Sequence, residues 1–262
     1  MTHPQRYGMP TSRVPEICKR SAENRPLTRS LNRRAPAIIQ SVMKLISVNT
    51  GLPRRVLWEG QTVESGIFKQ PVTGRVPLRK LNLDGDRQAD LTVHGGQHKA
   101  VYCYPIAHYG YWRKELPDHD LPMGSFGENF TMESELEDAV HLGDRFSIGT
   151  AEVVVTQPRI PCYKLIIKFG IADMIKRFLA SGRTGFYVSV AREGEVGAGD
   201  EIYRTAHDPG GTPISEITRL YLTKNYTTED LARVEQALKI AALPESWKRY
   251  FRGRLDRIET SQ

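Results

Sequence analysis

The chain is poor in cysteine and has no long apolar run. These two absences argue against a disulfide-rich secreted protein and against a membrane-spanning one. Its 262 residues include three cysteines, Cys18, Cys103 and Cys162, which are odd in number and widely spaced. They form neither a disulfide framework nor a CxxC metal pair, so we expect a protein of a reducing compartment, the cytoplasm. No apolar run approaches the roughly eighteen residues of a membrane span, and no apolar signal segment follows the basic first residues. We therefore expect no membrane association.

Several common catalytic motifs are also missing. The sequence contains no P-loop, no GxSxG elbow, no zinc-ligand spacing and no GxGxxG after a strand-like segment. It also has no flavin or iron–sulfur signature. The commoner motif-based assignments therefore fail, and any chemistry must come from side chains that the fold gathers.

Positive charge is concentrated in the first 42 residues. The formal net charge is +7, and residues 1–42 hold eight Lys or Arg against two acids, which leaves only +1 for residues 43–262. A near-neutral body argues against a surface that tracks phosphates, so nucleic acid is not the expected partner. Residues 1–42 show no sustained apolar period. We expect either a start codon placed too far upstream, with Met43 as the true first residue, or a disordered basic extension; a nucleic-acid-binding tail ranks last.

Residues 43–205 show the pattern of a mainly-β domain. Short alternating or β-branched segments separated by Gly, Pro and Asp predict a β-barrel with peripheral helices rather than βαβ units. The expected strands are residues 44–48, 62–68, 75–83, 100–104, 145–148, 151–156 and 186–190. Peripheral helices are expected at residues 105–116 and 166–180, and residues 193–200 read as a glycine-rich turn before a final strand.

Beyond a hinge at residues 208–211 the pattern becomes helical. Helices are expected at residues 215–222, 228–238 and 244–255, with Thr227 and Asp230 spaced as a capping box. Residues 212–257 are too few to enclose much core, so this small three-helix domain must pack on the barrel or on another subunit. A homodimer is one possible outcome.

Cys162 is the residue most suited to chemistry. It follows Pro158, Arg159 and Pro161 in a rigid extended turn, and Lys164 comes two residues later. Nearby positive charge favours the thiolate, the form that attacks electrophiles and binds soft metals. The alternative is a buried cysteine that acts as a small hydrophobe, the interpretation we give to Cys103.

Two further loops carry polar groups that can converge with this cysteine. In residues 84–100, His94 and Lys99 flank the adjacent glycines Gly95 and Gly96, which allow the backbone to approach a ligand closely, and Arg87 adds another cation. In residues 124–130, Asn129 supplies both a donor and an acceptor. A thiolate, several cations, a histidine and accessible backbone amides would suit an anionic cofactor that holds a soft metal.

The ordered set of short blocks in this chain resembles the MOSC domain family, named after the C-terminal domain of molybdenum cofactor sulfurase. Within that family it is similar to the YiiM-type proteins, which add a short three-helix domain. The resemblance covers residues 43 to about 255 and rests on the blocks DGDRQAD at 84–90, VHGG at 93–96, KAVY at 99–102, GEN at 127–129, QPRIPC at 157–162 and GEVGAGD at 194–200.

The resemblance implies a barrel that binds molybdenum cofactor, with Cys162 as the protein thiolate on or beside molybdenum. Positions that match the family blocks make these residues the candidates for cofactor contacts: Lys99, Arg159, His94, Asn129, Arg87, Gly95 and Gly96. It further implies reduction of small N-hydroxylated compounds in detoxification, a proton from His94 or Glu128, and electrons from a separate redox protein. Pyridoxal phosphate binding is a further expectation from the family. The alternative on the same fold is a sulfur carrier with a persulfide on Cys162.

Overall fold

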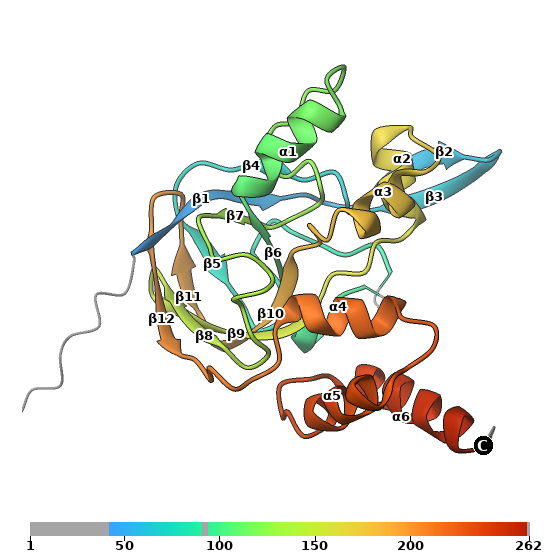
Figure 1. Cartoon of the computed structure of the whole chain (residues 1–262). Coiled ribbons are helices and arrows are strands. Elements are labelled where there is room, and N and C mark those ends of the chain that lie inside the picture. Colours follow the sequence, from blue (N-terminus) through green and yellow to red (C-terminus); the bar gives the residue numbers. More distant parts are fainter. Residues whose placement is uncertain (1–41, 91–93, 261–262) are drawn as a thin grey trace, which may run out of the picture. The chain divides into compact units, whose positions relative to one another are not determined.

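The computed structural model describes residues 42–90 and 94–260, and seven of its strands close into a β-barrel (Figure 1). Around the barrel they run β12, β8, β9, β10, β6, β7 and β1, and β1 pairs with β12 to close the ring. All neighbours are antiparallel except β6 and β7. The bounds of the barrel strands are Met43–Thr50 for β1, Val101–Pro105 for β6, Phe130–Met132 for β7, Arg145–Ile148 for β8, Ala151–Pro158 for β9, Phe186–Arg192 for β10 and Glu201–Ala206 for β12.

The expected β-barrel is thus confirmed, and its strands show the alternation from which it was predicted. In β10 buried positions alternate with half-buried ones up to Val190, which is the pattern of a strand with one face toward the core. The last four residues of β9, Val155–Pro158, are buried on both faces. Helix α4 (Ile214–Leu222) and the short turn Gln97–Lys99 both contact β9, which accounts for the burial of both faces.

Three smaller pairings lie outside the seven-strand ring. Strand β4 (Gln70–Pro71) pairs with β1, β5 (Val76–Leu78) pairs with β11 (Gly194–Val196), and β2 (Arg54–Trp58) forms a hairpin with β3 (Gln61–Ser65). The strand expected at 62–68 therefore ends at Ser65, and the one expected at 75–83 is shorter because the chain turns back after Leu78, where the Arg79 N–H donates to the Asn82 carbonyl at 2.8 Å. The turn expected at 193–200 contains β11.

The helix expected at 166–180 is two helices. Helix α2 (Tyr163–Phe169) ends at Gly170, whose φ of 70° is left-handed, and α3 (Met174–Ala180) follows. A left-handed glycine closes a helix because it lacks the Cβ that would clash there. Together with α1 (Ala107–Glu115), these helices bury a second apolar cluster built around Tyr104, Trp112, Phe126 and Phe178.

The C-terminal helices are α4 (Ile214–Leu222), α5 (Thr228–Leu238) and α6 (Glu245–Glu259). The predicted capping box is present, because Asp230 N–H donates to Thr227 Oγ1 and Thr227 N–H donates to Asp230 Oδ2. Apolar side chains from all three helices belong to the same buried cluster as the barrel core: Ile214, Ile217, Leu220, Val234, Ala237, Trp247 and Phe251. Among the described residues, no helix is both long and apolar enough to cross a bilayer. The predictions for the basic tail fall on residues 1–41, outside the described residues.

Candidate functional site

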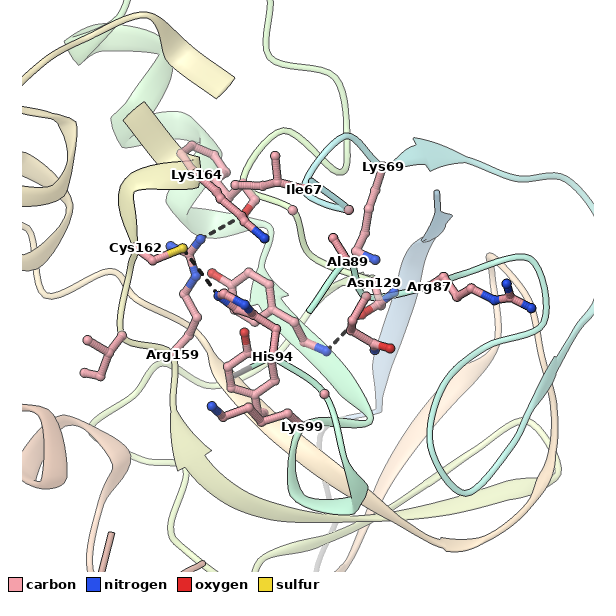
Figure 2. Close-up of a pocket in the computed structure, with 18 residues that line it drawn as sticks. Ile67, Lys69, Arg87, Ala89, His94, Lys99, Asn129, Arg159, Cys162 and Lys164 are labelled. Carbon is pink, nitrogen blue, oxygen red and sulfur yellow. Dashed lines mark hydrogen bonds between the residues drawn. The ribbon is translucent and has the colours of Figure 1, made fainter. Parts of the chain in front are cut away.

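A pocket with an empty volume of about 670 Å³, including the solvent at its mouth, opens between the turn after β9 and four loops. These loops are the segment after β3, the segment before η1 (Gln97–Lys99), η1 itself and the turn before β7. Figure 2 shows the lining side chains around the cavity. Its charged and thiol-bearing lining residues are Lys69, Arg87, His94, Lys99, Arg159, Cys162 and Lys164.

Cys162 lies half-buried at the residue that precedes α2, in an extended conformation with φ −125°. Pro161 before it is buried, so the thiol is held in place rather than carried on a free surface turn. Its Sγ lies 3.5 Å from Nε2 of His94 (Figure 2). These two residues belong to loops far apart in the sequence, and the fold brings them into contact.

Arg159 is a buried cation with an unsatisfied donor. Its side chain is 5% exposed; Nη2 donates to the Phe126 carbonyl at 3.5 Å, and Nη1 has no hydrogen-bond partner. Burial acts to lower the pKa of Arg159, but the phenols of Tyr102 and Tyr187 and the sulfur of Cys162 outweigh it and raise that pKa above its usual value. A guanidinium that stays charged with a free N–H is suited to bind an anionic oxygen.

His94 is held neutral near pH 7. Burial lowers its pKa, and the cations Lys164, Lys99 and Arg159 lower it further, while Asp90 opposes them. Its Nδ1 is buried without a hydrogen-bond partner in the structure. The ring therefore presents Nε2 to Cys162 and has a buried Nδ1 that makes no hydrogen bond with the described residues.

Lys99 and Lys164 approach the thiol from two different elements. Lys99 ends η1, and burial lowers its pKa while the Cys162 sulfur acts to raise it. Lys164 stands in the first turn of α2 and is 8% exposed, so its charge is also largely removed from water. Both therefore add positive charge to the part of the pocket that Cys162 lines.

Asn129 lines the pocket, but its side-chain amide is engaged by the protein. Its Oδ1 accepts from the Tyr102 N–H at 3.1 Å, and its Nδ2 donates to Asp86 Oδ2 at 2.9 Å and to the Asn49 carbonyl at 3.2 Å. Asp86 in turn is paired with Lys69. The amide therefore stabilises the pocket wall and has no nitrogen donor left over for a ligand.

The other four predicted residues differ in how they lie relative to the pocket. Glu128 does not line the pocket; its buried carboxylate accepts from Tyr109, Thr131 and the backbone of Gly124 and Phe126. Arg87 lines the pocket, but its guanidinium points away from the other cations (Figure 2). Gly95 lines the cavity, whereas Gly96 is exposed and does not.

Lys69, Tyr102 and Tyr187 also line the pocket and were not predicted from the sequence. Lys69 is 8% exposed, and burial lowers its pKa while Asp86 opposes that shift. Its signal is a lysine just after an apolar pair in residues 66–69, a segment that overlaps an expected strand. Tyr102 and Tyr187 stand on neighbouring strands, and nothing in their local sequence marks them as facing a pocket.

A closed β-barrel with a thiol, a histidine and buried cations at one pocket, followed by three helices, defines the class of protein. The MOSC domain model matches residues 90–203, and the model for the YiiM-like 3-alpha helix domain matches residues 213–257. The chain belongs to the MOSC domain family, in its YiiM-like branch.

Individual relatives support this membership. The chain is 38% identical to the uncharacterized protein YflK of Bacillus subtilis over 220 residues, which are 84% of this chain and 97% of that protein. It is 30% identical to a protein named Reductase from Gibberella moniliformis over 73% of this chain, but that match spans only 34% of the relative. The crystal structure of YiiM from Geobacillus stearothermophilus superposes with a TM-score of 0.67 at 32% identity, covering 81% of this chain and 99% of that one.

The pocket residues fit the cofactor with which MOSC domains are associated in general. Molybdenum cofactor carries an anionic phosphate and soft sulfur ligands, and the pocket offers a soft thiol together with Arg159 Nη1 and His94 Nδ1, two buried nitrogens that lack partners. No group of three or more His, Cys, Asp or Glu in the described part of the chain has the arrangement of a metal site. A metal held by Cys162 would therefore depend on ligands that arrive with it.

Proposed function

We propose that the chain binds molybdenum cofactor in this pocket and reduces N-hydroxylated bases or similar compounds. The observation that carries the proposal is the combination of a half-exposed thiol, 3.5 Å from His94, with a buried guanidinium that has a free N–H. A buried guanidinium that stays charged and whose Nη1 makes no hydrogen bond is suited to bind an anion there. Membership of a family that includes a relative named Reductase supports the reaction class.

Each residue has a distinct part in this proposal. Cys162 supplies the thiolate ligand, Arg159 and Lys99 bind anionic oxygens of the cofactor, and Lys164 adds charge next to the thiol. Asn129 keeps the pocket wall in place through Asp86. When bound, the cofactor would supply a redox-active metal that can accept an oxygen atom and transfer two electrons.

The reaction needs two electrons and two protons, which convert R–NH–OH into R–NH₂ and water. The electrons come from a separate redox protein. His94 lines the pocket, and we propose that it passes protons on to the substrate: the neutral ring takes up a proton from solvent and, because its pKa is lowered, gives that proton up more readily than free imidazolium does. The buried carboxyl of Glu128 is outside the cavity, so it has no direct path to a substrate.

Metal and pterin analysis of Cys162→Ser tests the proposal. The wild-type chain, purified from a host that makes the cofactor, should carry both molybdenum and pterin and should reduce an N-hydroxylated base in the presence of a reductant. Cys162→Ser should keep its fold and lose the reductase activity and most of the molybdenum. Cys103→Ala is the matched control, since Cys103 is buried in the barrel core away from the pocket. Full molybdenum occupancy in Cys162→Ser would reject the ligand role.

A second candidate uses the same thiol as a sulfur carrier. Partial exposure of Cys162 beside His94 and several cations would also stabilise a persulfide anion. Mass spectrometry that finds one labile extra sulfur on Cys162, in a chain free of metal and pterin, would favour this alternative.

A further inference from the structure

Gln157 in β9 has both ends of its buried side-chain amide hydrogen bonded. Its Oε1 accepts from the indole Nε1 of Trp247 at 2.6 Å, and its Nε2 donates to the His98 carbonyl at 2.9 Å. Gln157 is 2% exposed and Trp247 is 8% exposed. A flipped amide would set N–H against N–H at one end and oxygen against oxygen at the other. The Trp247 donor therefore fixes which way the amide points.

At its Nε2 end, Gln157 contacts the turn η1, which contains Lys99. The His98 carbonyl accepts from Thr156 Oγ1 at 2.7 Å as well as from Gln157, and His98 is the middle residue of η1. The two residues before η1, Gly95 and Gly96, have φ values of 101° and 79°. Glycines give the backbone wide conformational freedom, so contacts at the turn itself contribute strongly to its position.

We propose that Trp247 is a positioning residue of the pocket, which acts through Gln157 to hold η1 and hence Lys99 at the cavity wall. The three-helix unit is then a structural part of the pocket, since α6 supplies the hydrogen bond that orients a strand residue behind it. The inference depends on the proposed function only for the identity of the bound group. The effect of Trp247 on the position of η1 does not require that group.

Hydrogen exchange of the full chain, followed by mass spectrometry, tests the positioning directly. Trp247→Phe keeps an aromatic ring in the core and removes the N–H. Loss of one buried hydrogen bond should speed exchange of the amides in residues 94–100 about tenfold, without a matching change in the rest of the barrel. Tyr250→Phe is the matched control: it lies in the same helix and loses a hydroxyl that donates to the Tyr221 carbonyl within the helical unit. It should leave residues 94–100 as protected as in wild type.

Gln157→Met provides an independent break in the same chain of contacts and decides the question if Trp247→Phe does not fold. It should raise exchange in residues 94–100 in the same way, and the double variant should exchange no faster than Gln157→Met alone, because the two contacts act in series. Unchanged protection of residues 94–100 in a folded Trp247→Phe would overturn the proposal, whatever Gln157→Met shows. So would a uniform rise in exchange across the whole barrel and α4–α6, which indicates general destabilisation.

Pterin content separates this inference from the proposed function. If the wild-type chain carries pterin, Trp247→Phe should carry less of it at limiting cofactor, while Tyr250→Phe should match wild type; equal content in all three would contradict the link to the pocket. If the wild-type chain carries no pterin, the proposed function fails, and the exchange data alone still decide the positioning role of Trp247.

Discussion

At the scale of single residues, Arg159 shows a conflict between stability and binding. Its buried guanidinium has an Nη1 without a partner and packs on the rings of Tyr102 and Phe178, with centroid distances of 5.2 and 4.9 Å. The phenols of Tyr102 and Tyr187 and the Cys162 sulfur favour the charged form, but Nη1 makes no hydrogen bond, so an apolar side chain of similar length in place of Arg159 should cost the fold little. The residue is therefore better explained by what the pocket binds than by what the fold needs.

We predict that Arg159→Met binds the pterin cofactor about 10–100-fold more weakly, the usual cost of losing a charged hydrogen bond. Its free energy of unfolding without cofactor should fall by no more than about 1 kcal/mol, or should rise. Pterin content and thermal unfolding of the same samples measure the two effects. Arg87→Met is the control, because Arg87 lines the same pocket but points away from the other cations; it should change pterin content by less than about twofold. A large loss of stability in Arg159→Met with normal pterin content would contradict this account.

The sequence indicates some site residues and not others, because it does not show in which direction a side chain points. Cys162, His94 and Lys99 stand in loops whose prolines and glycines mark them locally, and the structure brings all three to one cavity. Glu128 and Asn129 are adjacent, so the backbone sends their side chains in different directions, and only Asn129 reaches the cavity. The register of the following strand decides which of these two neighbours faces the pocket. The sequence of the loop alone does not reveal that register.

At the scale of elements, the turn before β10 depends on a glycine. Gly185 has φ +67°, and a Cβ there would lie 2.5 Å from the Cys103 carbonyl and 2.9 Å from the rings of Tyr102 and Tyr104. The Gly185 carbonyl accepts a hydrogen bond from the backbone N–H of Arg159 at 3.2 Å. The turn therefore connects the backbone of the cysteine-bearing segment to β6, and there is no room for a side chain.

We predict that Gly185→Ala lowers the free energy of unfolding by about 3 kcal/mol or more, because strain at positive φ adds to a clash with backbone and two buried rings. Gly182→Ala separates the two effects. Gly182 has the same φ of +67°, but a Cβ there would meet nothing within 4 Å, so only the strain of about 1–2 kcal/mol should appear. Denaturant unfolding of both variants measures the difference, and equal losses would show that the clash is relieved.

The first turn of α5 should respond to acid through Asp230. A hydrogen bond from the Thr227 N–H, together with the Arg219 guanidinium, lowers the pKa of Asp230 in the folded protein. A carboxyl with a depressed folded pKa contributes stability above its unfolded pKa, near 3.9, and loses that contribution as pH falls through the folded value. Asp230→Asn should therefore be less stable than wild type at neutral pH, and the difference should vanish toward about pH 2.

Thermal unfolding across that pH range checks the prediction. Glu229→Gln is the control in the same helical turn, since its contact with Arg233 is long, at 3.5 Å, and exposed. It should change stability little at any pH. A difference between Asp230→Asn and wild type that stays constant into acid would assign the effect to packing rather than to charge.

The sequence predicts whether a segment is a helix or a strand better than it predicts the residues at which the segment begins and ends. Alternation along β10 and β9 is enough to predict both as barrel strands, because burial on one face imposes a period of two. The break at Gly170 was missed because apolar residues continue at helical spacing on both sides of it, and a single glycine inside such a pattern is tolerated in many helices. Strand order around the barrel is set by contacts far apart in sequence, which local patterns do not encode.

At the scale of the whole molecule, the helical unit and the barrel share one apolar core. Ile214, Ile217 and Leu220 of α4 are fully buried in the same cluster as Val153 and Val155 of β9. The C-terminal end of β9 leads directly into the turn that contains Arg159 and Cys162. The three-helix unit thus packs against the strand that leads into the thiol-bearing turn.

We predict that a chain ending at Ala206 aggregates or unfolds well below the temperature of the full chain, because removing α4–α6 exposes to water the barrel side chains of the shared apolar cluster. Each buried aliphatic side chain of α4 contributes about 1.5–3 kcal/mol, so loss of three of them alone approaches the total stability of a typical domain. Solubility and thermal unfolding measure the effect. The matched control is a chain that begins at Met43, which removes a comparable length from the other end and should keep the unfolding temperature and pterin content of the full chain. A soluble barrel with normal pterin content in the chain ending at Ala206 would show that the helices are dispensable for both the core and the pocket, in contradiction to the shared core and to the contact from Trp247 to Gln157.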